Sequence, residues 1–277
     1  MILFSEFPLI LYFLFSYLIS RGIWILLGLS DNSHQGLLLL AGFGPTLAAV
    51  VLTLSKSGVS GLKNLLRLKW RVKGHWYLIS LFGTPLVMLT ALGLHVALGG
   101  ARPRYMDPNH LVTSLNQWPL IIVVFSYVFV FTALGEEFGW RGYAQPRLQA
   151  NITPFTSSII LGISWALWHL PLFWLAGNFH QQLPLSWFLL QIMGSTFLYT
   201  WMYNHTRGSL LSAMVFHASS NAAVGLLPIL QLDNGGSLRP LWLVVLLLWL
   251  LVLLVLWFDR HSFFTKQIFN EKNPNHP

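Results

Sequence analysis

The amino-acid sequence predicts an all-α, polytopic membrane protein, a bundle of about eight transmembrane helices. Of its 277 residues, 55% are hydrophobic and only 9% are charged, which is too little charge to cover the surface of a soluble protein. The apolar residues are also gathered in stretches of roughly 20, the length that an α-helix needs to cross a bilayer. No internal repeat divides the chain, so residues 1–277 are expected to form one transmembrane domain.

Eight apolar stretches qualify as membrane spans. The first follows an N-terminus, MILFSEFPLI, that has no basic residues, and it is long enough to span, so we expect a retained helix rather than a cleaved signal peptide. The polar segment SDNSHQ separates it from the second. Beyond the last span, residues 259–277 are expected to form a polar tail. The predicted spans are residues 7–29, 36–54, 76–99, 118–143, 155–176, 184–203, 208–231 and 240–258.

The basic residues lie in loops and are unevenly distributed among them. Segment 55–74 is strongly basic and has no acidic residue, whereas the charged residue of SDNSHQ is Asp31. Because Lys and Arg are enriched in cytoplasmic loops, both termini are predicted to be cytoplasmic. The net charge of +8 is thus explained by membrane topology, so the lipid bilayer, and no nucleic acid, is the expected partner. Arg21, inside the first span, is the basic residue that this scheme leaves over.

Only two of the eight acidic residues, Glu136 and Glu137, lie inside a predicted span. Ionisable groups at bilayer depth are costly, so they usually face the bundle interior, pair with other groups and mark a functional site. The alternative is that both lie in wet surroundings at the cytoplasmic end of the helix. Since the chain contains no cysteine, thiol nucleophiles and thiolate metal ligands are excluded, and any catalysis must use oxygen or nitrogen groups.

The spacing of the charged residues separates the two carboxylates. Glu137 and Arg141 are four residues apart, so on a helix they are neighbours and can form an ion pair. Glu136 projects about 100° away from Glu137. The sequence therefore predicts one neutralised carboxylate and one free carboxylate, which suits a general base acting on water.

Two histidines inside spans have polar or aromatic partners one turn away. Trp165 and His169 share one helix face, and His217 and Asn221 share another. Each also has a structural interpretation: a buried histidine bonded to another helix, a tryptophan that only packs, or an asparagine that joins two helices. His95 has no such companion, and we interpret it as a buried structural residue. Together with the glutamates, the paired residues could activate water against a carbonyl and stabilise an oxyanion.

Three motifs in this order resemble a known family. They are EExxxR in GEEFGWRGY, an aromatic residue three positions before His in WALWH, and HxxxN in HASSN. With the lead-in GSLLSAMVFH and the early segment GFGPTLAAVVLTL, they resemble the type II CAAX prenyl protease family, also called CPBP (CAAX protease and bacteriocin-processing) or Abi. The motif-bearing core is expected at about 118–231.

The resemblance implies an eight-helix intramembrane glutamate protease that hydrolyses a peptide bond near the end of a membrane-associated protein or peptide. In eukaryotes such enzymes remove the last three residues of prenylated CAAX proteins. Carried over to this sequence, Glu136 and His169 would activate water, and His217 and Asn221 would form the oxyanion hole.

The same resemblance assigns supporting roles to the remaining motif residues. Glu137 and Arg141 would hold the site in shape, in agreement with their spacing. Trp165 stands where the family commonly has Phe, which affects the shape of the pocket more than the chemistry. The expected location is the cell membrane in a prokaryote or the endoplasmic reticulum in a eukaryote.

Other functions remain open at this stage. Two Glu and two His could bind zinc, although HExxH is absent and no cofactor is expected; a metal also leaves the Glu137–Arg141 spacing unexplained. A non-catalytic membrane scaffold or bacteriocin-immunity protein could retain the same bundle. A transporter with a carboxylate proton relay is less favoured, because the two halves show no inverted repeat.

Overall fold

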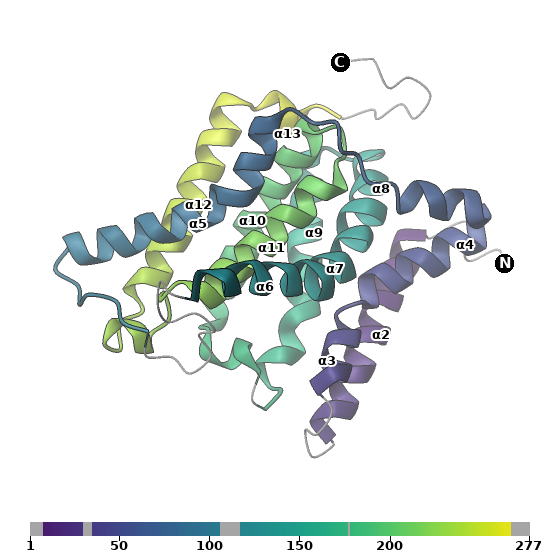
Figure 1. Cartoon of the computed structure of the whole chain (residues 1–277). Helices are drawn as coiled ribbons and strands as arrows, with labels where there is room; N and C mark the ends of the chain where they lie inside the picture. Colours follow the sequence, from purple (N-terminus) through teal and green to yellow (C-terminus); the bar gives the residue numbers. More distant parts are fainter. Residues whose placement is uncertain (1–7, 30–34, 106–116, 177, 267–277) are drawn as a thin grey trace.

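The computed structural model describes residues 8–29, 35–105, 117–176 and 178–266, and all regular secondary structure in these ranges is helical (Figure 1). The predicted all-α fold class is therefore confirmed. The α-helices are α2 (Pro8–Leu29), α3 (Gln35–Ala41), α4 (Gly44–Leu65), α5 (Gly74–Ala97), α6 (Trp118–Val128), α7 (Leu134–Gly139), α8 (Gln145–Gln149), α9 (Pro154–His169), α10 (Leu185–His205), α11 (Leu210–Leu226), α12 (Arg239–Phe258) and α13 (His261–Phe264). Three short 3₁₀ segments join them: η4 (Leu170–Phe173), η5 (Phe179–Gln182) and η6 (Leu232–Asn234).

Five helical stretches within the described ranges are long and apolar enough to cross a membrane: Pro8–Gly28, Gly74–Ala97, Pro119–Gln149, Pro154–Phe173 and Arg239–Phe258. The other three predicted spans are helical but less regular. Residues 36–54 are divided between α3 and α4, α10 carries several polar side chains, and α11 is a shorter apolar helix. Buried polar side chains lower the hydropathy of α10 because that helix packs against other helices rather than only against lipid.

The helices form two groups joined by the motif-bearing segment (Figure 1). On one side α2 packs against α4, which contacts α7. On the other, α11 packs against α5, and α12 contacts both α5 and α10. α9 lies beside α10 and α11 contacts α7. Trp165 of α9 reaches Glu136 of α7 and His217 of α11, so side chains of these three helices meet in the interior of the bundle.

Residues 118–149 form one continuous helix with two wider turns. The α-helical α7 lies between two π-helical segments, η2 (Phe129–Ala133) and η3 (Trp140–Ala144). Single π turns inside α-helices occur often at functional sites, since they rotate the following side chains relative to the preceding ones. They also change which backbone N–H group each backbone carbonyl pairs with. Here the hydroxyl of Thr46 on α4 donates a hydrogen bond to the Leu134 carbonyl at 2.9 Å.

Two glycines on α7 allow the helix to touch the start of α4. A Cβ atom added at Gly135 would lie 2.9 Å from the Gly42 carbonyl oxygen, and one at Gly139 would lie 2.5 Å from the Pro45 carbonyl oxygen. Both distances are shorter than van der Waals contact, so only glycine fits without backbone movement. The segments GFGP and GEEFG are therefore complementary surfaces, and their contact leaves the two glutamates free to face α9 and α11.

Two expected loops contain helical structure. α4 continues through the basic segment to Leu65, with a break in helical geometry at Gly58. The predicted polar tail also begins with α13, where Phe263 is 1% exposed and packs on Phe197. This helix is therefore part of the bundle, while residues 267–277 of the predicted tail lie outside the described residues.

We predict that Gly139→Ala destabilises the fold by about 1–3 kcal/mol, as overpacking of a close contact does. Its control is Gly93→Ala on α5, where an added Cβ meets no atom within 4 Å; a helical Gly→Ala change at an open position should stabilise by roughly 0.5–1 kcal/mol. Thermal melts of the two variants in one detergent provide the measurement. Equal melting temperatures would contradict the close contact.

Candidate active site

The three sequence motifs meet between α7, α9 and α11. Glu136 and Glu137 come from α7, Trp165 and His169 from α9, and His217 from α11, and all five are buried. Arg141, on η3, is 1% exposed. The predicted residues are thus brought together by helices that are distant in the sequence.

Glu137 joins the first motif to the third. Its Oε1 atom accepts hydrogen bonds from Arg141 Nη1 at 3.0 Å and from His217 Nδ1 at 2.7 Å. The predicted ion pair between Glu137 and Arg141 is therefore present. Because a carboxylate only accepts hydrogen bonds, Nδ1 of His217 carries its proton, and the ring is held with Nε2 directed away from Glu137.

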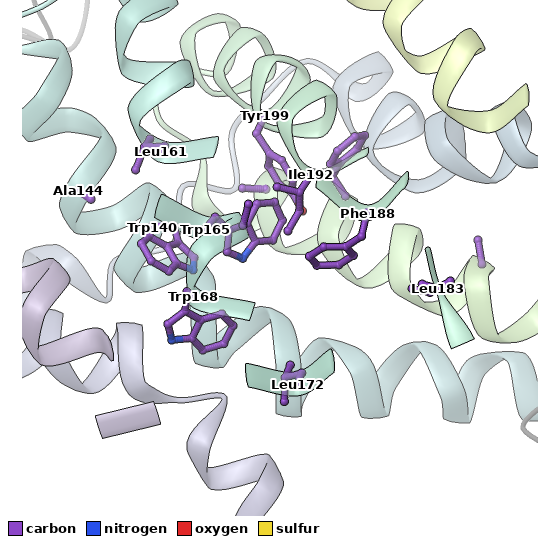
Figure 2. Packing of buried hydrophobic residues seen from close by; sticks show 14 of the residues in the cluster. Trp140, Ala144, Leu161, Trp165, Trp168, Leu172, Leu183, Phe188, Ile192 and Tyr199 are labelled. Carbon is purple, nitrogen blue, oxygen red and sulfur yellow. The ribbon is translucent and has the colours of Figure 1, made fainter. Parts of the chain in front are cut away.

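Aromatic rings enclose the Arg141 guanidinium. Its central carbon lies 4.4 Å from the ring centroid of Trp165 and 3.8 Å from that of Tyr199. Trp165 and Tyr199 belong to the buried aromatic cluster in Figure 2, which also includes Trp140 and Trp168. Ring faces attract a cation and exclude water, so they stabilise the charge while keeping the ion pair desolvated.

The spacing predicted that the Glu136 carboxylate is free. In the structure it lies instead against side chains of two other helices, α9 and α11. Its Oε2 atom accepts a hydrogen bond from Trp165 Nε1 at 2.6 Å. Its Oε1 atom lies 3.9 Å from His217 Nε2. That separation is longer than a direct hydrogen bond, and a water molecule can bond to both atoms at once.

The charges of this buried cluster balance only with one additional proton. Two ionised glutamates and Arg141 together leave one negative charge if His217 is neutral. An unbalanced charge in a desolvated interior is strongly unfavourable. The arrangement therefore favours one proton on either Glu136 Oε1 or His217 Nε2, the two atoms that face each other.

His169 lies one helical turn beyond Trp165, at the end of α9. Its Nδ1 atom is 2.9 Å from the Trp165 carbonyl oxygen, so this nitrogen donates and Nε2 is left with a lone pair. The ring contacts Trp165, Trp168, His180 and Phe188. His169 thus adjoins the Glu136 cluster through Trp165.

Asn221 lies one turn beyond His217 on α11. It is exposed, and within the described ranges its side chain makes no hydrogen bond. Its amide group is therefore available to a ligand that approaches from that side. His95, by contrast, is 1% exposed, as expected for a buried structural residue. Among the described residues neither of its ring nitrogens has a hydrogen-bond partner.

Sequence reasoning missed several residues beside the motifs. Gln145 and Gln149 continue the four-residue spacing of Glu137 and Arg141, and both are buried. This spacing could have indicated them from the sequence. His180, in η5, stacks near His169 with ring centroids 5.5 Å apart. No local pattern marked His180 or Tyr199, because they reach the site through loop and helix packing.

Within residues 8–29, 35–105, 117–176 and 178–266, no three His, Asp or Glu side chains form a group suited to hold a metal ion. His217 Nδ1 also points to Glu137. Hydrogen bonds instead join Glu137 to Arg141 and His217.

Comparison with known proteins gives the same family as the motifs. Residues 117–223 match the family model "Type II CAAX prenyl endopeptidase Rce1-like". Over 192 residues the chain is 28% identical to "CAAX prenyl protease 2" of Methanococcus maripaludis, an alignment that covers 66% of this chain and 65% of that protein. The matched part thus spans about two thirds of the relative's length. The predicted family resemblance is confirmed, and the protein is a polytopic integral membrane protein.

We predict that Glu137→Gln is much less stable than Glu136→Gln. The first change weakens the bonds of both Arg141 and His217 and leaves a buried guanidinium unpaired, which costs about 3–5 kcal/mol. The second changes a carboxylate whose charge the cluster has to neutralise. Melting temperatures of both variants, purified side by side, test this difference. Similar losses would contradict the bridging role of Glu137.

A second prediction concerns the loop that carries His180. Burial lowers the pKa of His180 to about 4, below its usual value of about 6.5. Since the folded state binds this proton less readily than the unfolded state, loop stability should be complete above about pH 6.5 and fall as the pH drops toward about 4. Hydrogen exchange in residues 178–183 measures this. His180→Phe should remove the pH dependence.

Proposed function

We propose that the protein is an intramembrane endopeptidase that hydrolyses a peptide bond near the end of a membrane-associated protein, because residues 117–223 match the Rce1-like family model. The observation that carries the proposal is the pair formed by Glu136 Oε1 and His217 Nε2, buried and 3.9 Å apart. Trp165 and Glu137 hold the two side chains in place. A water molecule between them would meet a proton acceptor and a proton donor.

In the proposed reaction, water adds to the peptide carbonyl carbon while its proton passes to Glu136, with His169 Nε2 as the second acceptor. The carbonyl oxygen becomes an oxyanion. Asn221 would donate to it from its exposed amide, and His217 from Nε2. Because Nδ1 of His217 already donates to Glu137, donation from Nε2 requires the imidazolium form.

Collapse of the tetrahedral intermediate breaks the C–N bond. The proton taken from water is returned to the leaving amine, so Glu136 is an ionised base again after each cycle. Glu137 and Arg141 act as positioning residues that hold the histidine and do not touch the substrate. No metal ion is required by this scheme.

The proposed substrate is a peptide or protein held at the membrane, as the location of the site in an apolar bundle suggests. A prenylated CAAX-type carboxyl terminus is the specific substrate that the family description supports. We further propose that both termini are cytoplasmic, because the basic segment 55–74 would then face the cytoplasm.

We predict that Glu136→Gln abolishes cleavage while the protein remains folded, since the isosteric amide cannot accept water's proton. The matched control is Asp259→Asn, another carboxyl-to-amide exchange, at a partly exposed residue just after α12 and outside the site. The measurement is cleavage of a prenylated peptide ending in a CAAX sequence by the two purified variants. Turnover within a few-fold of wild type in Glu136→Gln would refute the proposed base, whereas no cleavage by the wild-type protein itself would favour a non-catalytic scaffold.

Asn221→Ala should lower turnover by roughly 10² or more, as loss of one oxyanion donor does, with little change in substrate binding. Asn64→Ala, an exposed asparagine in the basic segment, is the control. Exhaustive chelation should leave wild-type activity unchanged. Activity that is lost to a chelator and restored by zinc would instead establish the metal-dependent alternative.

A further inference from the structure

Arg21 is a basic residue inside a membrane span that neither the topology nor the proposed site explains. It lies 13 residues into α2, about 20 Å from the start of the helix at ~1.5 Å per residue. A charge at that depth is costly and normally has an identifiable partner. Among the described residues, the ion pairs of Glu136, Glu137 and Asp259 do not include Arg21.

The contacts that Arg21 makes with the described residues hold its side chain in place but include no acidic group. One terminal nitrogen, Nη2, donates to the Leu167 carbonyl in the last turn of α9 at 2.6 Å. The guanidinium carbon lies 4.7 Å from the Tyr17 ring centroid, and the Tyr17 hydroxyl donates to the Ser164 carbonyl. In the described ranges Arg21 Nε and the neighbouring Trp24 Nε1 have no acceptor.

Arg21 and Trp24 line a cavity of about 480 Å³ between α2 and η4. This volume lies within the range of small-molecule sites, roughly 300–1,000 Å³. The remaining wall is apolar, with Ile25 on one side and Leu170 and Leu175 on the other. Trp174, at the rim, is 70% exposed, which suits a tryptophan at a membrane interface.

We propose that this cavity binds one anionic phospholipid. Charge complementarity selects the head group: the Arg21 guanidinium, which has no carboxylate partner among the described residues, lies in the cavity wall, and phosphate–arginine bonds are among the stronger charge-assisted ones. The apolar wall selects an acyl chain over water. The bilayer around α2 supplies a molecule with both parts. The cavity shares no lining residue with the Glu136 cluster, so a bound lipid would not occupy the proposed catalytic site.

The cavity also adjoins the candidate site through the backbone. Leu170, in its wall, directly follows His169. The Arg21 bond to Leu167 lies in the same last turn of α9. A lipid bound at Arg21 therefore stabilises the end of the helix that positions His169.

The test compares lipid-dependent stabilisation of the full chain in detergent micelles, with phosphatidylglycerol or phosphatidylcholine added. We expect phosphatidylglycerol to raise the wild-type melting temperature more, and native mass spectrometry to detect one retained phosphatidylglycerol. In Arg21→Gln this lipid-specific increase should be lost, with apparent affinity at least about tenfold weaker, as expected for loss of a charged hydrogen bond. Arg21→Lys should retain part of it.

Two further variants separate a site from general charge attraction. Arg239 also donates to a carbonyl at the end of a neighbouring helix, that of Leu98, but lines no part of this cavity, so Arg239→Gln should keep the full increase. Gly28→Phe keeps every charge and fills the cavity, so it should lose the increase. Equal stabilisation of wild type and Arg21→Gln would overturn the proposal. Stabilisation by soluble glycerol phosphate alone would also overturn it, since the site would then bind a free phosphate.

Discussion

The structure depends on one buried constraint: the carboxylate of Glu137 bonds at once to Arg141 and to His217. Three ionisable groups in an apolar bundle are tolerated only when their hydrogen bonds and charges are satisfied together. This requirement ties the motif helix to α11 and orients the imidazole. Trp165 and Tyr199 complete the enclosure on the other side of the guanidinium. The site is therefore rigid because its charges are costly to separate.

Close helix packing makes this arrangement attainable. Glycines at 135 and 139 allow α7 to contact the backbone of α4, which leaves the opposite face of α7 for α9 and α11. The two π turns divide one long helix into parts with different surroundings: its α6 part is largely exposed and its α7 part is buried. In the absence of a strong hydrophobic driving force between helices in lipid, such small-residue contacts and polar bonds decide which helices associate.

Much of the candidate site could be predicted from the sequence because several of its residues lie one helical turn apart. The Glu137–Arg141 pair follows from a spacing of four residues, and helix formation around it from the apolar flanks. The hydrogen bond from Trp165 to Glu136 could not be predicted, since a tryptophan one turn from a histidine is equally consistent with a side chain that only packs. His180 and Arg21 illustrate the same limit: the sequence marked Arg21 as unexplained, but only folding brings η4 beside α2 to form a cavity there.

The sequence by itself determined the helical membrane fold and the residues that carry charge into it, because hydropathy and helical periodicity act over short stretches of chain. The tertiary structure alone decided how those residues are used. Glu136 meets Trp165 across 29 residues and Glu137 meets His217 across 80. Contacts of that separation depend on helix rotation and depth, which are set by packing between helices and not by any local pattern. For the same reason Asn221 is exposed while His217, one turn away, is buried.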